Sequence, residues 1–272
     1  MFPIAIVLFY LIMAEKENSA FRLYRFIQKM VAQQPPNQQT AQVLLKSFGV
    51  DKSTAQREQN AILARVMLLL FDELESLVAD LRRAGYSDES LQPIVRPFDL
   101  LSGVGLATQW SANSQGFAAC LPVLRLVGET LPEDSAAVSS EELSELGNSI
   151  EKLRAEVQES TLPDAVKSFV FEQVDIIKRA IKDYPLAGAN AFKSAVREAI
   201  FHAGEHSEVI AEYKDTPTMT SLKQIQEKAV NYAKYAIEVS KFVGALDSLY
   251  QHLQGAPAVA HALSGLVQHV VK

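Results

Sequence analysis

The longest amphipathic pattern in the chain runs from Met219 to Gln254, and it constrains the fold more than any other feature. Apolar residues recur there at alternating steps of three and four, which is the spacing of one face of a helix. Thr218 or Thr220 can cap its start, and Gly255 followed by Pro257 marks its end. Such a helix would be about 50 Å long and needs helical partners along its length. We call this apolar face the seam; it comprises Leu222, Ile225, Ala229, Tyr232, Ala236, Val239, Val243, Leu246, Tyr250 and Leu253.

Shorter helical patterns precede the seam and predict an antiparallel bundle over residues 138–272. Ser139 and Glu142 have the spacing of a capping box, which predicts where the first helix of the bundle begins. The turn Ser160–Pro163 is short, so the second helix is expected to fold back along the first.

A third helix is predicted over Leu186–Ala203, because Pro185 is expected to end the second helix and Gly188 permits a tight turn. A polar loop is expected between this third helix and the seam. A terminal helix is predicted over Ala258–Val271, with Val259, Leu263, Leu266 and Val270 on its apolar face.

The stretch Gly128–Ser140 is mostly polar and contains Pro132, which is typical of a boundary between domains. It separates the bundle from a helical N-terminal region over residues 1–128. The sequence therefore predicts an all-α protein with two parts, of which the second contains one long heptad-patterned helix.

The helix predicted to begin at Ser53 is the main element of the N-terminal region. Ser53 and Gln56 have capping-box spacing, and Gly85 supplies a left-handed stop. Its middle, Val66–Phe71, is apolar on all sides, which predicts that this helix lies at the centre of the region.

Two smaller elements accompany this helix in the N-terminal region. An amphipathic helix is predicted over Phe21–Val31, with Arg22 and Arg25 on its polar side. A short helix is predicted over Ser87–Pro97, and Pro93 is expected to interrupt it.

The first residues, Met1–Ala14, carry no charged side chain. They are too short to span a membrane of about 30 Å and lack the basic start of a secretory signal. Three interpretations stay open: a buried first helix, a segment Met1–Met13 that contacts a membrane or a partner, and a natural start at Met13.

The formal net charge of −6 disfavours nucleic acid as a partner, because proteins that bind phosphate backbones usually present a basic face. The single cysteine, Cys120, cannot form an intramolecular disulfide, which fits a cytoplasmic location. Its neighbours are apolar, which favours a buried structural thiol over a nucleophile.

The sharpest candidate for chemistry is the run His202-Ala203-Gly204-Glu205-His206. Its H-x-x-E-H order is that of zinc peptidases in which His202 and His206 would bind zinc and Glu205 would activate water. A third ligand would have to come from Glu208, Glu212 or His261. The alternative is a solvated helix end, where histidines favour the negative end of the helix dipole.

The run from Leu162-Pro163 through Lys167–Val170, followed by Ile177–Tyr184 and Gly188, resembles a pattern in uncharacterised all-helical bacterial proteins. The resemblance covers a short stretch of the chain and implies a bacterial origin. It hints at mobile-element or phage-defence operons and assigns no site residue.

These observations predict a non-enzymatic interaction or regulatory protein that needs no cofactor and binds a protein partner or itself. The expected contact residues lie on the seam, at Tyr232, Val239, Leu246 and Tyr250. Two alternatives stay open: a membrane-associated effector that uses the apolar N-terminus, and a zinc-dependent hydrolase at the H-x-x-E-H run.

Overall fold

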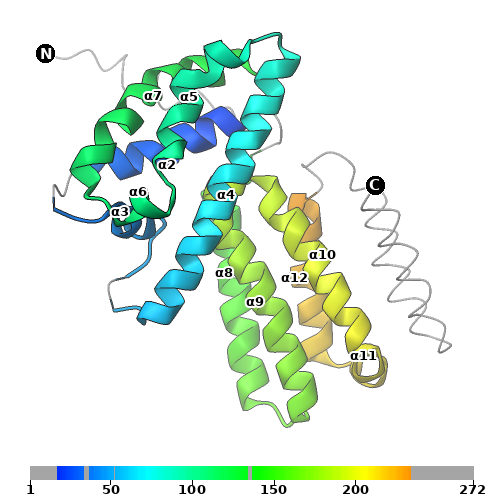
Figure 1. Ribbon diagram of the computed structural model, residues 1–272. Helices are drawn as coiled ribbons and strands as arrows, with labels where there is room; N and C mark the ends of the chain where they lie inside the picture. Colours follow the sequence, from blue (N-terminus) through cyan, green and yellow to red (C-terminus); the bar gives the residue numbers. More distant parts are fainter. Residues whose placement is uncertain (1–16, 34–36, 52, 134–136, 234–272) are drawn as a thin grey trace, which may run out of the picture. The chain divides into compact units, whose positions relative to one another are not determined.

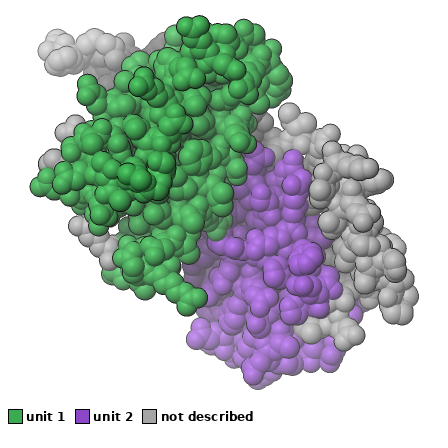
Figure 2. All heavy atoms as spheres, in the orientation of Figure 1, with its two compact units in different colours: residues 1–134, 185–187 green, residues 135–184, 188–272 purple. Residues whose placement is uncertain are grey.

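The computed structural model describes residues 17–33, 37–51, 53–133 and 137–233. Within these ranges the chain forms eleven helices, so the predicted all-α class is confirmed (Figure 1). The chain divides into two compact units (Figure 2). Unit 1 comprises residues 1–134 and 185–187, and unit 2 comprises residues 135–184 and 188–272.

Unit 1 is built around α2, which packs along α7 and also contacts α4 and α3. Helix α5 also packs against α7, and the core between these helices contains Leu23, Leu77 and Phe117. The helices are α2 (Ser19–Ala32), α3 (Thr40–Ser47), α4 (Gln56–Arg83), α5 (Asp88–Asp99), α6 (Gly103–Ala107) and α7 (Trp110–Thr130).

Helix α4 differs from its prediction in two respects. Its N-cap is Ala55, which makes no side-chain cap hydrogen bond, so the predicted capping box of Ser53 and Gln56 is wrong. It also buries one side only, since Leu68 is 66% exposed within the stretch expected to be central. The central position belongs to α2, because it contacts α4, α3 and α7 and buries Leu23, Phe26, Ile27 and Met30.

Helix α5 runs without interruption through Pro93 and Pro97, contrary to the prediction. A proline inside a helix costs about 3 kcal/mol. Leu91, Ile94 and Phe98 are buried on the core side of α5. Burial of each such side chain contributes about 1.5–3 kcal/mol, so packing outweighs the local cost of the prolines.

The connection from α5 to α7 contains the short helix α6, which begins at Gly103. A Cβ atom at Gly105 would lie 1.7 Å from the carbonyl oxygen of Leu100. No side chain fits at that distance, so Gly105 permits a close approach of two backbone segments.

Unit 2 begins with α8 (Ser140–Glu159) and α9 (Asp164–Ala187), which form an antiparallel hairpin. The predicted capping box is confirmed, since the Ser139 hydroxyl accepts from the Glu142 backbone and the Glu142 carboxylate accepts from the Ser139 backbone. Two ion pairs join the hairpin, Arg154 with Asp175 and Glu151 with Lys178. Their order along both helices is that of an antiparallel pair, and the Lys178 ammonium lowers the pKa of Glu151.

Helix α9 continues through Pro185 to Ala187, so the predicted stop at Pro185 is wrong. The chain then turns at Gly188, whose φ of 55° and ψ of −145° lie in a region that only glycine adopts readily. The predicted tight turn at Gly188 is therefore found, three residues after Pro185. Its successor is α10 (Ala189–Glu205).

The predicted polar loop before the seam contains a further helix, α11 (Ser207–Tyr213), in which Ile210 is buried. The seam helix begins as α12 (Pro217–Ala233). Its start is capped by Thr216, whose hydroxyl accepts a hydrogen bond from the Met219 backbone at 3.3 Å, so neither Thr218 nor Thr220 is the cap. The seam residues after Ala233 lie outside the described residues.

Candidate functional site

The candidate site is the end of unit 2 at which α12 reaches the first turns of α8 and α10. Tyr232 of α12 is 9% exposed, and its ring packs edge-to-face on Phe192 with 5.2 Å between centroids. Its hydroxyl donates to the carbonyl oxygen of Glu142 at 3.4 Å. Glu142 lies in the first turn of α8, and Phe192 in the first turn of α10.

The packing along α12 shows that α10 and α12 are antiparallel. Near the middle of α12, Gln226 lies near Ala199 and Ile200, in the second half of α10. At the end of α12, Tyr232 contacts Phe192, near the start of α10. Beyond Tyr232, therefore, α10 has less than one turn left before its first residue, and α8 has equally little.

The seam residues up to Tyr232 are buried within unit 2. Leu222, Ile225 and Ala229 are each no more than 3% exposed, and Tyr232 closes the row. The other predicted contact residues, Val239, Leu246 and Tyr250, lie outside the described residues. The assignment of these four residues to a partner surface stays a prediction. Little of the Tyr232 side chain is exposed for contact with a partner.

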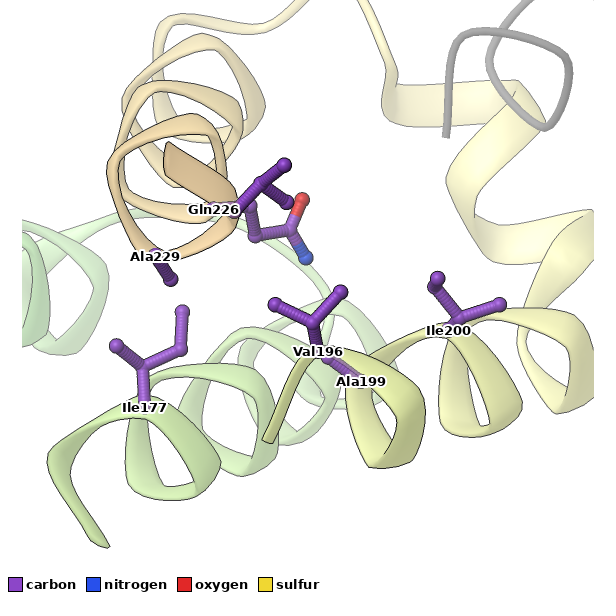
Figure 3. Close-up of a pocket in the computed structure, with 7 residues that line it drawn as sticks. Ile177, Val196, Ala199, Ile200, Gln226 and Ala229 are labelled. Carbon is purple, nitrogen blue, oxygen red and sulfur yellow. The ribbon is translucent and has the colours of Figure 1, made fainter. Parts of the chain in front are cut away.

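A small cavity lies next to this row, between α9, α10 and α12 (Figure 3). Its walls are apolar except for Gln226, and its free volume of about 10 Å³ is the size of one water molecule. The Gln226 side chain donates to the Gln173 oxygen at 2.9 Å, and Gln173 donates to the carbonyl oxygen of Ala199 at 3.3 Å. These buried amides link α9, α10 and α12 through hydrogen bonds. The cavity beside them has no room for a ligand larger than a water molecule.

The H-x-x-E-H residues lie at the end of α10. Nδ1 of His202 is 3.5 Å from a Glu205 oxygen, and Nε2 of His206 is 3.7 Å from an oxygen of Glu172 in α9. The His206 ring also packs on Phe169, with 5.5 Å between centroids. The two histidines thus pair with different carboxylates.

In the part of the chain that the structure describes, no three histidine, cysteine or acidic side chains gather as a group that could hold a metal ion. Of the third ligands suggested by the sequence, His261 lies outside that part. The zinc-hydrolase alternative therefore gains no support from the arrangement of His202 and His206.

A buried ion network in unit 1 was missed by the sequence reasoning. Arg22 is 2% exposed, and its Nε donates to Oε1 of Glu73 at 2.6 Å. Glu17 lies 3.5 Å from Arg22 and 2.7 Å from Arg25. The helical spacing of the sequence could have indicated that Arg22 is buried. Arg22 precedes Phe26 by four residues and so lies on the buried face of α2.

Cys120 is buried, as expected, and its thiol donates to the Phe117 carbonyl oxygen at 3.1 Å. Burial raises the pKa of the Cys120 thiol to about 12. A thiol that stays protonated at neutral pH is a poor nucleophile, so a structural role is favoured.

Comparison of the chain with protein-family models, with curated proteins and with solved structures finds no match. The resemblance to uncharacterised bacterial proteins around residues 162–188 therefore stays a prediction.

None of the helices in the described ranges combines the length and the apolar character needed to cross a bilayer. Met1–Met13, the segment for which membrane contact was considered, lies outside those ranges.

Proposed function

We propose that this chain is a non-enzymatic interaction protein that binds a protein partner, or a second copy of itself, through the seam beyond Ala233. The position of Tyr232 carries the proposal. Its hydroxyl and ring contact the first turns of α8 and α10. The N-terminal ends of these two helices therefore lie beside Tyr232, near the last described residue of α12.

The three-four spacing of apolar residues continues in the sequence well past this point. The row includes Val239, Leu246 and Tyr250 in the sequence, whereas α8 and α10 begin less than one turn before the residues that Tyr232 contacts. An apolar side chain of this size gains about 1.5–3 kcal/mol when it is removed from water. Several such residues in one row are typical of a helix that docks on another polypeptide.

We place this interaction in the cytoplasm of a bacterium. The single thiol supports a reducing compartment, since Cys120 is buried and has no second cysteine with which to pair. The bacterial origin rests on the sequence resemblance alone.

Photo-crosslinking in cells tests this function. A photoreactive phenylalanine analogue is placed at Val239, Leu246 or Tyr250 of the full chain, and at Lys241 or Ser248 on the polar side as controls. The proposal predicts adducts with a second polypeptide at the three seam positions and few at the controls, because only seam side chains would be within bonding reach of the partner.

Mass spectrometry of the adducts identifies the partner and separates self-association from binding to another protein. Adducts confined to the chain's own residues 258–271 would overturn the proposal, since the seam would then be covered internally. Equal yields at seam and control positions would overturn it as well.

A further inference from the structure

The buried face of α12 includes a row of three residues spaced by one heptad, Met219, Gln226 and Ala233, of which only the middle one is polar. Gln226 is 6% exposed, and Gln173 of α9 is fully buried. The Gln226 amide donates to the Gln173 side-chain oxygen at 2.9 Å, and the Gln173 amide donates to the Ala199 carbonyl oxygen at 3.3 Å. The hydrogen bond between the two side chains therefore links one level of α12 to one level of α9.

Apolar packing alone does not determine how far α12 reaches along its neighbours. The apolar residues of the seam repeat with a period of seven, and this spacing continues in the sequence past the last described residue. If α12 were displaced by seven residues towards its own start, Tyr232 would take the place of Ile225, and Val239 that of Tyr232. Apolar residues would again meet apolar surfaces. The opposite displacement would put Asp215 in the place of Leu222, so apolar packing already disfavours it.

The amide pair distinguishes the observed register from the displaced one. After a displacement of one heptad, Ala233 would occupy the place of Gln226, and Gln173 would lose this partner. Gln226 would move to the place of Met219, which is 2% exposed. A buried amide without its partner disfavours an arrangement about tenfold to a hundredfold. Buried polar residues select the register of heptad-patterned helices in this way.

We propose that Gln173 and Gln226 set the register of α12 in unit 2. Their hydrogen bond determines that Tyr232, rather than Val239, reaches Phe192 at the start of α10. It thereby determines which part of the seam is buried against α10 and which part follows. The proposal extends the function proposed above, because the same pair would select the seam residues that a partner meets, but the register itself concerns unit 2 alone.

The distance between two spin labels, measured by electron paramagnetic resonance, reports the register in the full chain. The labels are attached at Asn190→Cys in α10 and Lys228→Cys in α12, both exposed positions. Cys120 is fully buried and so reacts slowly with the label. Because α10 and α12 are antiparallel, displacement of α12 by one heptad moves position 228 about 10.5 Å further along the axis from position 190. The original register should give a single distance, and the displaced register a longer one.

The most direct variant transfers the amide by one heptad. Gln226→Met with Ala233→Gln places the amide seven residues later and repeats the residue type of Met219 at the earlier position. Gln173 regains its partner only if α12 moves by one heptad, so the longer distance should become the major one. The matched control Gln224→Met, at an exposed position of the same helix, should keep the shorter distance alone.

Removal of both amides tests the same point and leaves neither of them unpaired. Gln173→Met with Gln226→Met should show both distances, because a purely apolar contact no longer discriminates between the two registers. Circular dichroism identifies a variant that has lost its helices. If the transfer variant does not fold, the variant without either amide decides the question.

A folded transfer variant that keeps the shorter distance alone would overturn the proposal, since other contacts of α12 would then set the register. A single, shorter distance in the variant without either amide would overturn it as well. Neither measurement involves a partner. The register proposal can therefore fail while the crosslinks at Leu246 succeed, and the reverse outcome is equally recognisable.

Discussion

At the scale of single residues, Arg22 has the largest expected effect on stability. It is a charged group in the core of unit 1, held by Glu73 and Glu17. Transfer of an ion from water to a protein interior costs several kcal/mol, which a pair repays only if both partners and their hydrogen bonds are present. The network is therefore sensitive to the loss of either member.

We expect Arg22→Met to lower the free energy of unfolding by about 3–5 kcal/mol, because Glu73 would be left buried without its main partner. Adding Glu73→Leu to that variant should recover much of the loss, since the buried charge is then removed. Urea unfolding measures both, with exposed Lys29→Met of the same helix as the control. A single variant as stable as the control would contradict the expectation.

At the scale of helices, local chemistry could be predicted in part, since the capping box at Ser53 and Gln56 was wrong, and the effect of tertiary burial could not be predicted. The capping box of Ser139 and Glu142 was predicted because it involves neighbours along the chain. Pro93 and Pro185 were wrongly expected to break helices, because the burial of Ile94 and Leu186 beside them is not visible in a local pattern.

The turn between α9 and α10 should depend on Gly188. Its φ of 55° with ψ of −145° is strained for any residue with a Cβ atom, so Gly188→Ala should cost about 1–3 kcal/mol. Gly147→Ala is the matched control: Gly147 lies inside α8 with open space around it, and the change should stabilise the protein by about 0.5–1 kcal/mol. Thermal unfolding of both variants should give shifts of opposite sign.

At the scale of the whole molecule, the all-α class could be predicted from the sequence. The assignment of a short segment of the second half of the chain to unit 1 could not. Residues 185–187 of α9 belong to unit 1, and Leu186 is fully buried in its core. The candidate site shows the same limit. The seam spacing predicted Tyr232 as a partner contact, but it does not reveal that Tyr232 packs on Phe192 within unit 2.

Leu186→Ala should therefore destabilise unit 1 by about 2–5 kcal/mol, although Leu186 lies far along the chain from the rest of that unit. Fluorescence of Trp110 reports on this, because it is the sole tryptophan and is stacked on Phe117 in the unit 1 core. Leu126→Ala, at an exposed leucine of unit 1, should shift the unfolding midpoint little. Identical midpoints for the two variants would contradict the assignment of Leu186.

The place of Leu186 also bears on the order of events during synthesis. Once all of α7 has emerged from the ribosome, 56 more residues (131–186) must follow before Leu186 emerges, which takes several seconds at about 5–20 residues per second. Throughout that interval the nascent N-terminal half lacks one of its core side chains. Chaperones that recognise exposed apolar surface would have their longest opportunity to bind the growing polypeptide then.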